Sequence, residues 1–138
     1  MEQCPGTVLI IHDTPEGDYS GLTIGDLGPI GDGYCHGLLI HNVLAMDYQS
    51  REALGLVGQV LQVRRKVNKN ESVKASREHP QRESRLWPKG VEAVGRPPEG
   101  AIWVNLMDRA GTASRVWTAS SGWGSFTWCG AAPTAIYV

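Results

Sequence analysis

The chain has 138 residues and a formal net charge of −1, and 41% of its residues are hydrophobic. This length is typical of one domain with its own hydrophobic core, so we treat residues 1–138 as a single domain. The near-zero net charge excludes a globally basic nucleic-acid binder. The aliphatic runs, such as residues 8–11, are far too short for a transmembrane helix.

The N-terminus lacks the basic region and the apolar stretch of a signal peptide. We therefore expect no membrane association. Synthesis in the cytoplasm, compatible with later incorporation into a particle, fits this sequence best, although it does not specify a location.

Short apolar runs separated by glycine and proline predict β-structure, and the chain contains 17 Gly and 8 Pro. We predict a mainly β fold, a small antiparallel β-sandwich or barrel with at most one or two short helices. In chain order, the expected strands cover residues 7–12, 35–44, 59–67, 101–106, 114–118, 125–128 and 134–138.

The middle of the chain has two interpretations. Asp47 or Ser50 would cap a helix, although Gly55 and Gly58 each cost such a helix about 1 kcal/mol relative to Ala. A short helical turn followed by a strand over residues 59–67 avoids that cost. We favour the second interpretation.

Charge is distributed unevenly along the chain. Residues 1–50 contain seven Asp or Glu and no Lys or Arg, whereas residues 64–89 contain nine Lys or Arg and three Glu. Because this second stretch has few apolar residues, we expect residues 64–90 to form an extended loop, which we call the basic arm. A loop this long is usually functional or disordered.

The basic arm predicts a protein partner with an acidic surface, because complementary charge steers and orients association. Another copy of the chain offers such a surface in its acidic loops over residues 13–32. Nucleic acid is the less favoured partner, because the acidic first third would repel its backbone. The predicted partner-binding residues are Arg64, Arg65, Lys66, Lys69, Lys74, Arg77, Arg82, Arg85, Trp87 and Lys89.

Cys35 lies within Gly-Tyr-Cys-His-Gly, residues 33–37, which has the spacing of a nucleophile elbow. Such an elbow follows a strand and precedes a helix, whereas a glycine-rich loop precedes Cys35 and an apolar run follows it. A small Cys-dependent hydrolase with His12, His36 or His41 as the base is therefore an alternative function. We expect Cys35 to be catalytically idle.

The sequence predicts no metal ion and no cofactor. Cys4, Cys35 and Cys129 lack the paired spacing of a zinc site. His36 and His41 are five residues apart, so they would point to opposite faces of one strand. The loop carboxylates do not match the calcium-binding EF-hand pattern.

Three of the five tryptophans, Trp117, Trp123 and Trp128, lie close together near the C-terminus. Tryptophans grouped in this way form sugar-stacking platforms or, more often, anchor a core or an interface. A carbohydrate-binding module that uses these three residues is a further alternative.

No phosphate-binding loop, dinucleotide fingerprint or catalytic triad is found in the sequence. A β domain with an adhesive basic arm is typical of proteins that join larger assemblies. We therefore predict a non-enzymatic structural protein that acts through protein–protein contacts, such as a capsid- or tail-associated virion subunit.

Overall fold

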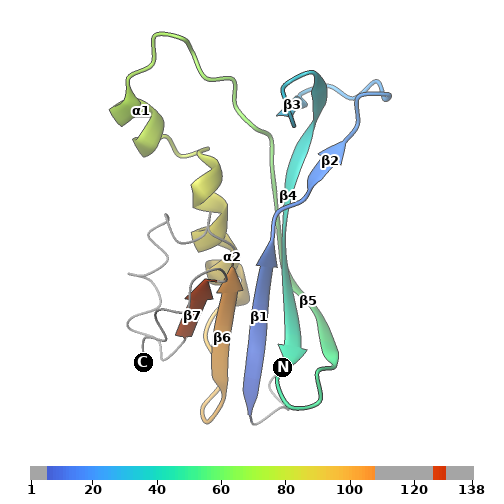
Figure 1. Ribbon diagram of the computed structural model, residues 1–138, viewed down its shortest axis with the longest axis vertical. Helices are drawn as coiled ribbons and strands as arrows, with labels where there is room; N and C mark the ends of the chain where they lie inside the picture. Colours follow the sequence, from blue (N-terminus) through green and yellow to red (C-terminus); the bar gives the residue numbers. More distant parts are fainter. Residues whose placement is uncertain (1–5, 108–125, 130–138) are drawn as a thin grey trace.

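The computed structural model describes residues 6–107 and 126–129. In chain order the elements are β1 (Thr7–Asp13), β2 (Glu16–Asp18), β3 (Gly28–Ile30), β4 (Cys35–Asp47), β5 (Ala53–Gln62), α1 (Val73–Glu78), the 3₁₀ turn η1 (Glu83–Arg85), α2 (Leu86–Val94), β6 (Ile102–Met107) and β7 (Phe126–Cys129). All these strands belong to one open sheet (Figure 1). No helix in the described ranges is long and apolar enough to cross a membrane.

Strand β4 organises the sheet, because four other strands pair with it antiparallel. β1 and β2 lie along one of its edges, and β5 and β3 lie along the other. Gly37 of β4 has a strand on each side, since it pairs with Asp18 of β2 on one side and with Gly28 of β3 on the other. A Cβ at Gly37 would meet the carbonyl oxygen of Gly17, so this close approach of backbones requires glycine.

The sheet is mixed, because β6 runs parallel to β1 and β7 runs parallel to β6. The mainly β class predicted from the sequence is confirmed, but the described strands form an open mixed sheet rather than an antiparallel sandwich or barrel. The apolar pattern of a strand does not reveal the direction of its neighbours. A parallel pair needs a long crossover connection, and here the connection between β5 and β6 contains the helices.

The basic arm contains helices, and its C-terminal part is docked on the sheet. It contains α1, η1 and most of α2, and α2 packs on β4 and β5 (Figure 1). Leu86, Trp87 and Val91 are the buried large side chains of α2. Pro88 argues against a helix in the sequence, yet it lies in the first turn of α2, where its missing N–H has no intrahelical partner to lose.

Residues 48–52 form a tight turn in place of the short helix considered there. The Asp47 carboxylate accepts hydrogen bonds from the backbone N–H groups of Gln49 and Ser50. β5 then begins at Ala53, earlier than the predicted start at residue 59. Gly55 has a φ of 133° where the β4–β5 register shifts, which explains a glycine in this strand.

One face of the sheet is covered by helix α2, and the other is not covered by a helix of the described residues. The face under α2 holds the buried core, which includes Val8, Ile10, Val43, Ala45 and Trp103. The opposite face carries the alternate residues, which the strand register aligns, and no helix of the described residues packs on it. We call it the open face, and its apolar residues include Leu9, Ile11, Ile40, Leu44, Leu56, Leu61, Ile102, Val104 and Leu106.

Candidate functional site

Strands β1 and β6 lie side by side and run in the same direction, so they end at one edge of the sheet (Figure 1). We call this end the carboxyl edge. β1 ends at Asp13, whose side chain is exposed. β6 ends at Met107, and the sequence continues with Asp108, which lies outside the described residues. Ligands of sheets with parallel strands bind at the carboxyl ends of those strands, which makes this edge the candidate site.

A row of hydrogen-bonded side chains crosses three strands just below the carboxyl edge. Thr14 Oγ1 lies 2.8 Å from His41 Nδ1, His41 Nε2 lies 3.2 Å from His12 Nδ1, and His12 Nε2 lies 3.0 Å from Asn105 Oδ1. We call these four residues the polar chain. His12, His41 and Asn105 are all buried, so each depends on these bonds to satisfy its polar atoms.

The hydrogen bonds of the polar chain have one consistent direction. Asn105 Oδ1 only accepts, so His12 Nε2 carries a proton. A neutral His12 then accepts at Nδ1 from the N–H at His41 Nε2, and His41 accepts at Nδ1 from the Thr14 hydroxyl. Burial lowers the pKa of His12, and the hydrogen bond to Asn105 only partly opposes that effect.

Helix α2 covers the two histidines directly. The Trp87 ring meets the His41 ring edge to face, with 4.9 Å between centroids. Gly90 lies against both imidazoles, since a Cβ there would be 2.7 Å from His41 Cδ2 and 3.1 Å from His12 Nδ1. Glycine at position 90 is therefore what allows α2 to seal the polar chain from water.

The polar chain lies beside the carboxyl edge and does not itself offer metal ligands. All four ring nitrogens of His12 and His41 are engaged in hydrogen bonds, whereas a metal needs a free nitrogen lone pair. Within the described part of the chain, no group of three or more His, Cys, Asp or Glu could hold a metal ion. A cation at Asp13 would take its other ligands from water or from residues outside the described ranges.

The cations of the basic arm fall into two groups. Arg64 contacts Glu16 at 2.7 Å and Glu83 at 2.6 Å, and Arg65 contacts Glu71 at 2.7 Å. Hydrogen bonding from Arg65 lowers the pKa of Glu71. The other predicted cations are exposed, and they are Lys66, Lys69, Lys74, Arg77, Arg82, Arg85 and Lys89.

Trp87 is one of the residues predicted to contact a partner, and the structure places it inside its own chain. Its side chain is 4% exposed and lies in the core between α2 and the sheet. The sequence argument placed it in an extended loop, where it would have no partner within the chain. Arg64 and Arg65 likewise bind carboxylates of their own chain.

The remaining sequence candidates are placed as follows. Cys35 is the first residue of β4, so a strand follows it where an elbow requires a helix. His12 and His41 are brought together, but His36 is exposed and does not join them. Trp117 and Trp123 lie outside the described residues, and Trp128 lies on β7.

The carboxyl edge was missed in the sequence, although a signal for it exists. The segments Val-Leu-Ile-Ile-His-Asp, ending at residue 13, and Trp-Val-Asn-Leu-Met-Asp, ending at residue 108, are both apolar runs that end in aspartate. The similarity becomes informative only through the parallel register, in which Ile11 pairs with Leu106 and the two strands end side by side. An antiparallel pair would place the two strand ends at opposite edges.

Comparisons with known proteins do not assign this chain to a family. No protein-family model matches it, and a search of the curated proteins finds no match. The geometry of the carboxyl edge is therefore the basis for a functional conclusion.

Proposed function

We propose that the chain performs divalent-cation-dependent phosphoryl transfer on nucleic acid, at the carboxyl edge. The observation that carries the proposal is the parallel pairing of β1 and β6, which ends β1 at the exposed Asp13 beside the end of β6. In this proposal Asp13 and Asp108 are the carboxylate ligands of a Mg²⁺ ion. Mg²⁺ is bound by one or two carboxylates and keeps several waters.

The chemistry of such a site is hydrolysis or transfer at a phosphodiester. A cation held by Asp13 would supply an activated water as the nucleophile and would stabilise the charge that develops on the phosphoryl oxygens. The water oxygen bonds to phosphorus as the bond from phosphorus to the 3′ oxygen breaks. The departing 3′ oxygen takes up a proton, and the products are a 5′ phosphate and a 3′ hydroxyl.

The exposed cations of the basic arm support nucleic acid as the substrate. Lys or Arg side chains bind phosphates through charge and release counterions. Figure 1 places α1 on the side of the molecule toward which β1 and β6 point, well above the tips of both strands. The acidic residues that argued against nucleic acid are partly neutralised, because Glu16 pairs with Arg64 and also accepts the Gly31 N–H.

The proposal is tested first by cation binding and then by cleavage. Titration calorimetry with Mn²⁺ should show binding by the wild type that is at least tenfold weaker in Asp13→Asn and Asp108→Asn. Asp26→Asn is the matched control, because Asp26 is an exposed loop aspartate with a φ of 62°, which Asn tolerates. A labelled DNA strand should be cleaved with Mn²⁺ by the wild type and the control only. Unchanged Mn²⁺ binding in Asp13→Asn would refute the proposal.

Assembly through protein–protein contacts, the function predicted from the sequence, is the second candidate, and the open face favours it. Leu56 is 57% exposed, Leu61 is 60% exposed and Ile102 is 44% exposed. An apolar surface of this kind marks interaction sites in soluble proteins. Sedimentation of wild type and Leu61→Glu would test it, since a self-associating chain should shift toward monomer in the variant. Monomeric wild type at high concentration would count against self-assembly.

A further inference from the structure

A cavity of about 430 Å³ lies between the chain that follows β5 and the turn that precedes η1. Three arginines line it, Arg64, Arg65 and Arg82, together with polar side chains that include Ser76 and Ser84. The proposed catalytic site does not use this cavity. Its walls come from segments about twenty residues apart in the sequence, and the Arg64–Glu83 ion pair joins them.

The bound carboxylates hold two of these guanidinium groups in place. Arg65 donates from both terminal nitrogens to Glu71 and from one of them to Ser76 Oγ. Arg64 donates to Glu16, to Glu83 and, at 3.5 Å, to the Pro29 carbonyl oxygen. Fixed donors of this kind favour binding because little side-chain entropy is lost when a ligand arrives.

Arg82 differs from the other two arginines. No carboxylate of the described residues forms an ion pair with it, and its side chain is exposed. All five of its N–H donors are therefore available at the mouth of the cavity. The Ser76 hydroxyl accepts from Arg65, so its own hydrogen is free to donate into the cavity.

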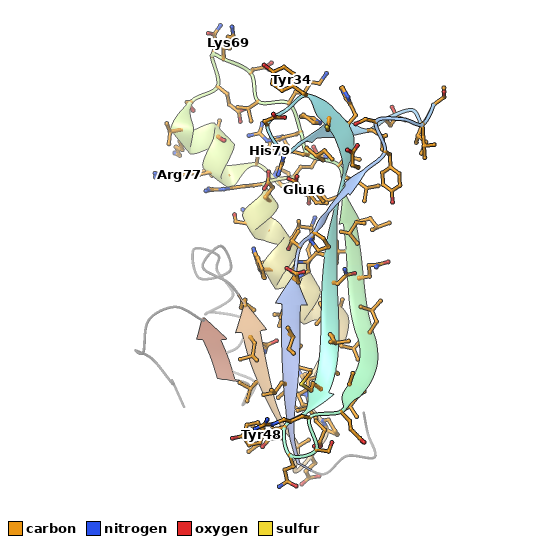
Figure 2. The ribbon with its side chains drawn as sticks, turned by 45° about the vertical axis from the view of Figure 1, so that its right-hand side comes forward. Glu16, Tyr34, Tyr48, Lys69, Arg77 and His79 are labelled. Carbon is orange, nitrogen blue, oxygen red and sulfur yellow. The ribbon has the colours of Figure 1, made fainter. Side chains whose placement is uncertain are left out.

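Three arginines line the cavity, and Glu83 is the carboxylate among its lining residues. After the internal hydrogen bonds are made, the cavity therefore has more free hydrogen-bond donors than acceptors. A phosphate group presents acceptors only, and the planar fork of arginine matches it in two-point geometry. The exposed cations around the cavity extend the positive surface. Figure 2 shows Lys69, Arg77 and His79 at the same end of the molecule as Glu16.

We propose that the cavity binds a backbone phosphate of a nucleic-acid strand, with Arg82 as the principal contact. This inference rests on the proposed function, because it makes the cavity the anchor for the strand that the carboxyl edge would process. Arg64 and Arg65 shape the cavity, and Glu16, Glu71 and Glu83 hold them. The cavity is thus a binding site separate from the cation site.

The test measures DNA binding without any divalent cation. Fluorescence anisotropy of a labelled oligonucleotide is followed in EDTA over a range of salt concentrations. Arg82→Gln should bind about three- to tenfold more weakly than the wild type, and its salt slope should fall by about one phosphate contact. Arg85→Gln is the matched control, because Arg85 is also an exposed arginine of the basic arm but does not line the cavity. It should weaken binding less.

Equal weakening by Arg82→Gln and Arg85→Gln would overturn the inference, because it would show only a general effect of charge. Inorganic phosphate at millimolar concentration is added as a competitor in a second arm. At constant ionic strength, phosphate should displace the strand from the wild type more readily than from Arg82→Gln, because both ligands compete for the cavity donors, and equal displacement from the two proteins would contradict the inference. Mn²⁺ binding by Asp13→Asn is measured in parallel. Loss of Mn²⁺ binding in that variant would support the proposed function. If Arg82→Gln at the same time leaves DNA binding unchanged, this inference is refuted and the proposed function stands.

Discussion

Replacing Gly90 with Ala tests whether close contact between α2 and the polar chain holds the helix on the sheet. Alanine has the higher helix propensity by about 1 kcal/mol, so a solvent-exposed position in a helix would gain stability from this change. Position 90 is buried, and the added methyl group would overlap His41 Nε2 and lie 2.7 Å from His41 Cδ2. Neither imidazole can move away without breaking a buried hydrogen bond.

The magnitude follows from these contacts. Overpacking of a buried site costs about 1–3 kcal/mol, and a broken buried hydrogen bond that leaves a polar atom unsatisfied costs about 1–3 kcal/mol more. Subtracting the propensity gain of about 1 kcal/mol, Gly90→Ala should lower the free energy of unfolding by about 1–5 kcal/mol. The polar chain should also lose its geometry in this variant.

Urea denaturation followed by tryptophan fluorescence measures the effect, because Trp87 lies in the same contact. Gly21→Ala is the matched control, since no atom lies within 4 Å of a Cβ at Gly21, and it should change stability by less than about 1 kcal/mol. A Gly90→Ala variant as stable as the wild type would refute the claim that α2 packs directly on the histidines.

Two further predictions concern the polar chain. Thr14→Val keeps the shape of the side chain but removes the hydroxyl that donates to His41 Nδ1, so the free energy of unfolding should fall by about 1 kcal/mol; a stability equal to wild type would contradict the hydrogen bond. Because burial lowers the pKa of His12 in the folded chain, the unfolded chain binds the proton first, and stability should decrease as the pH falls below about 6.5, by up to about 1.4 kcal/mol per pH unit. Denaturation curves from pH 7.5 to 5.0 measure this dependence, and His12→Asn should reduce it, whereas a slope unaffected by His12→Asn would assign it to other groups.

Local signals predicted the central strands well. Residues 7–12 and 101–106 were expected as strands and form most of β1 and β6, because continuous apolar runs of this length favour buried strands. Residues 35–44 likewise form most of β4. What these runs could not reveal was which strand lies beside which, and in which direction.

The basic arm shows why the sequence predicted an extended loop where the structure contains helices. Its polar sequence conceals α2, whose buried residues Leu86, Trp87, Gly90 and Val91 lie on one side of a nine-residue helix. Partners for these residues come from β1, β4 and β6, far away in the sequence, so no local pattern identifies them. The polar chain was missed for the same reason: His12, His41 and Asn105 belong to three strands that only the tertiary fold brings together.

The central claim is that Asp13 at the carboxyl edge binds a divalent cation. Crystals of the wild-type chain soaked in Mn²⁺ and measured at the manganese absorption edge test it most directly. The account predicts an anomalous difference peak within coordination distance of an Asp13 carboxylate oxygen, and its absence in crystals of Asp13→Asn. Wild-type crystals that bind manganese elsewhere, with no peak at Asp13, would contradict the account.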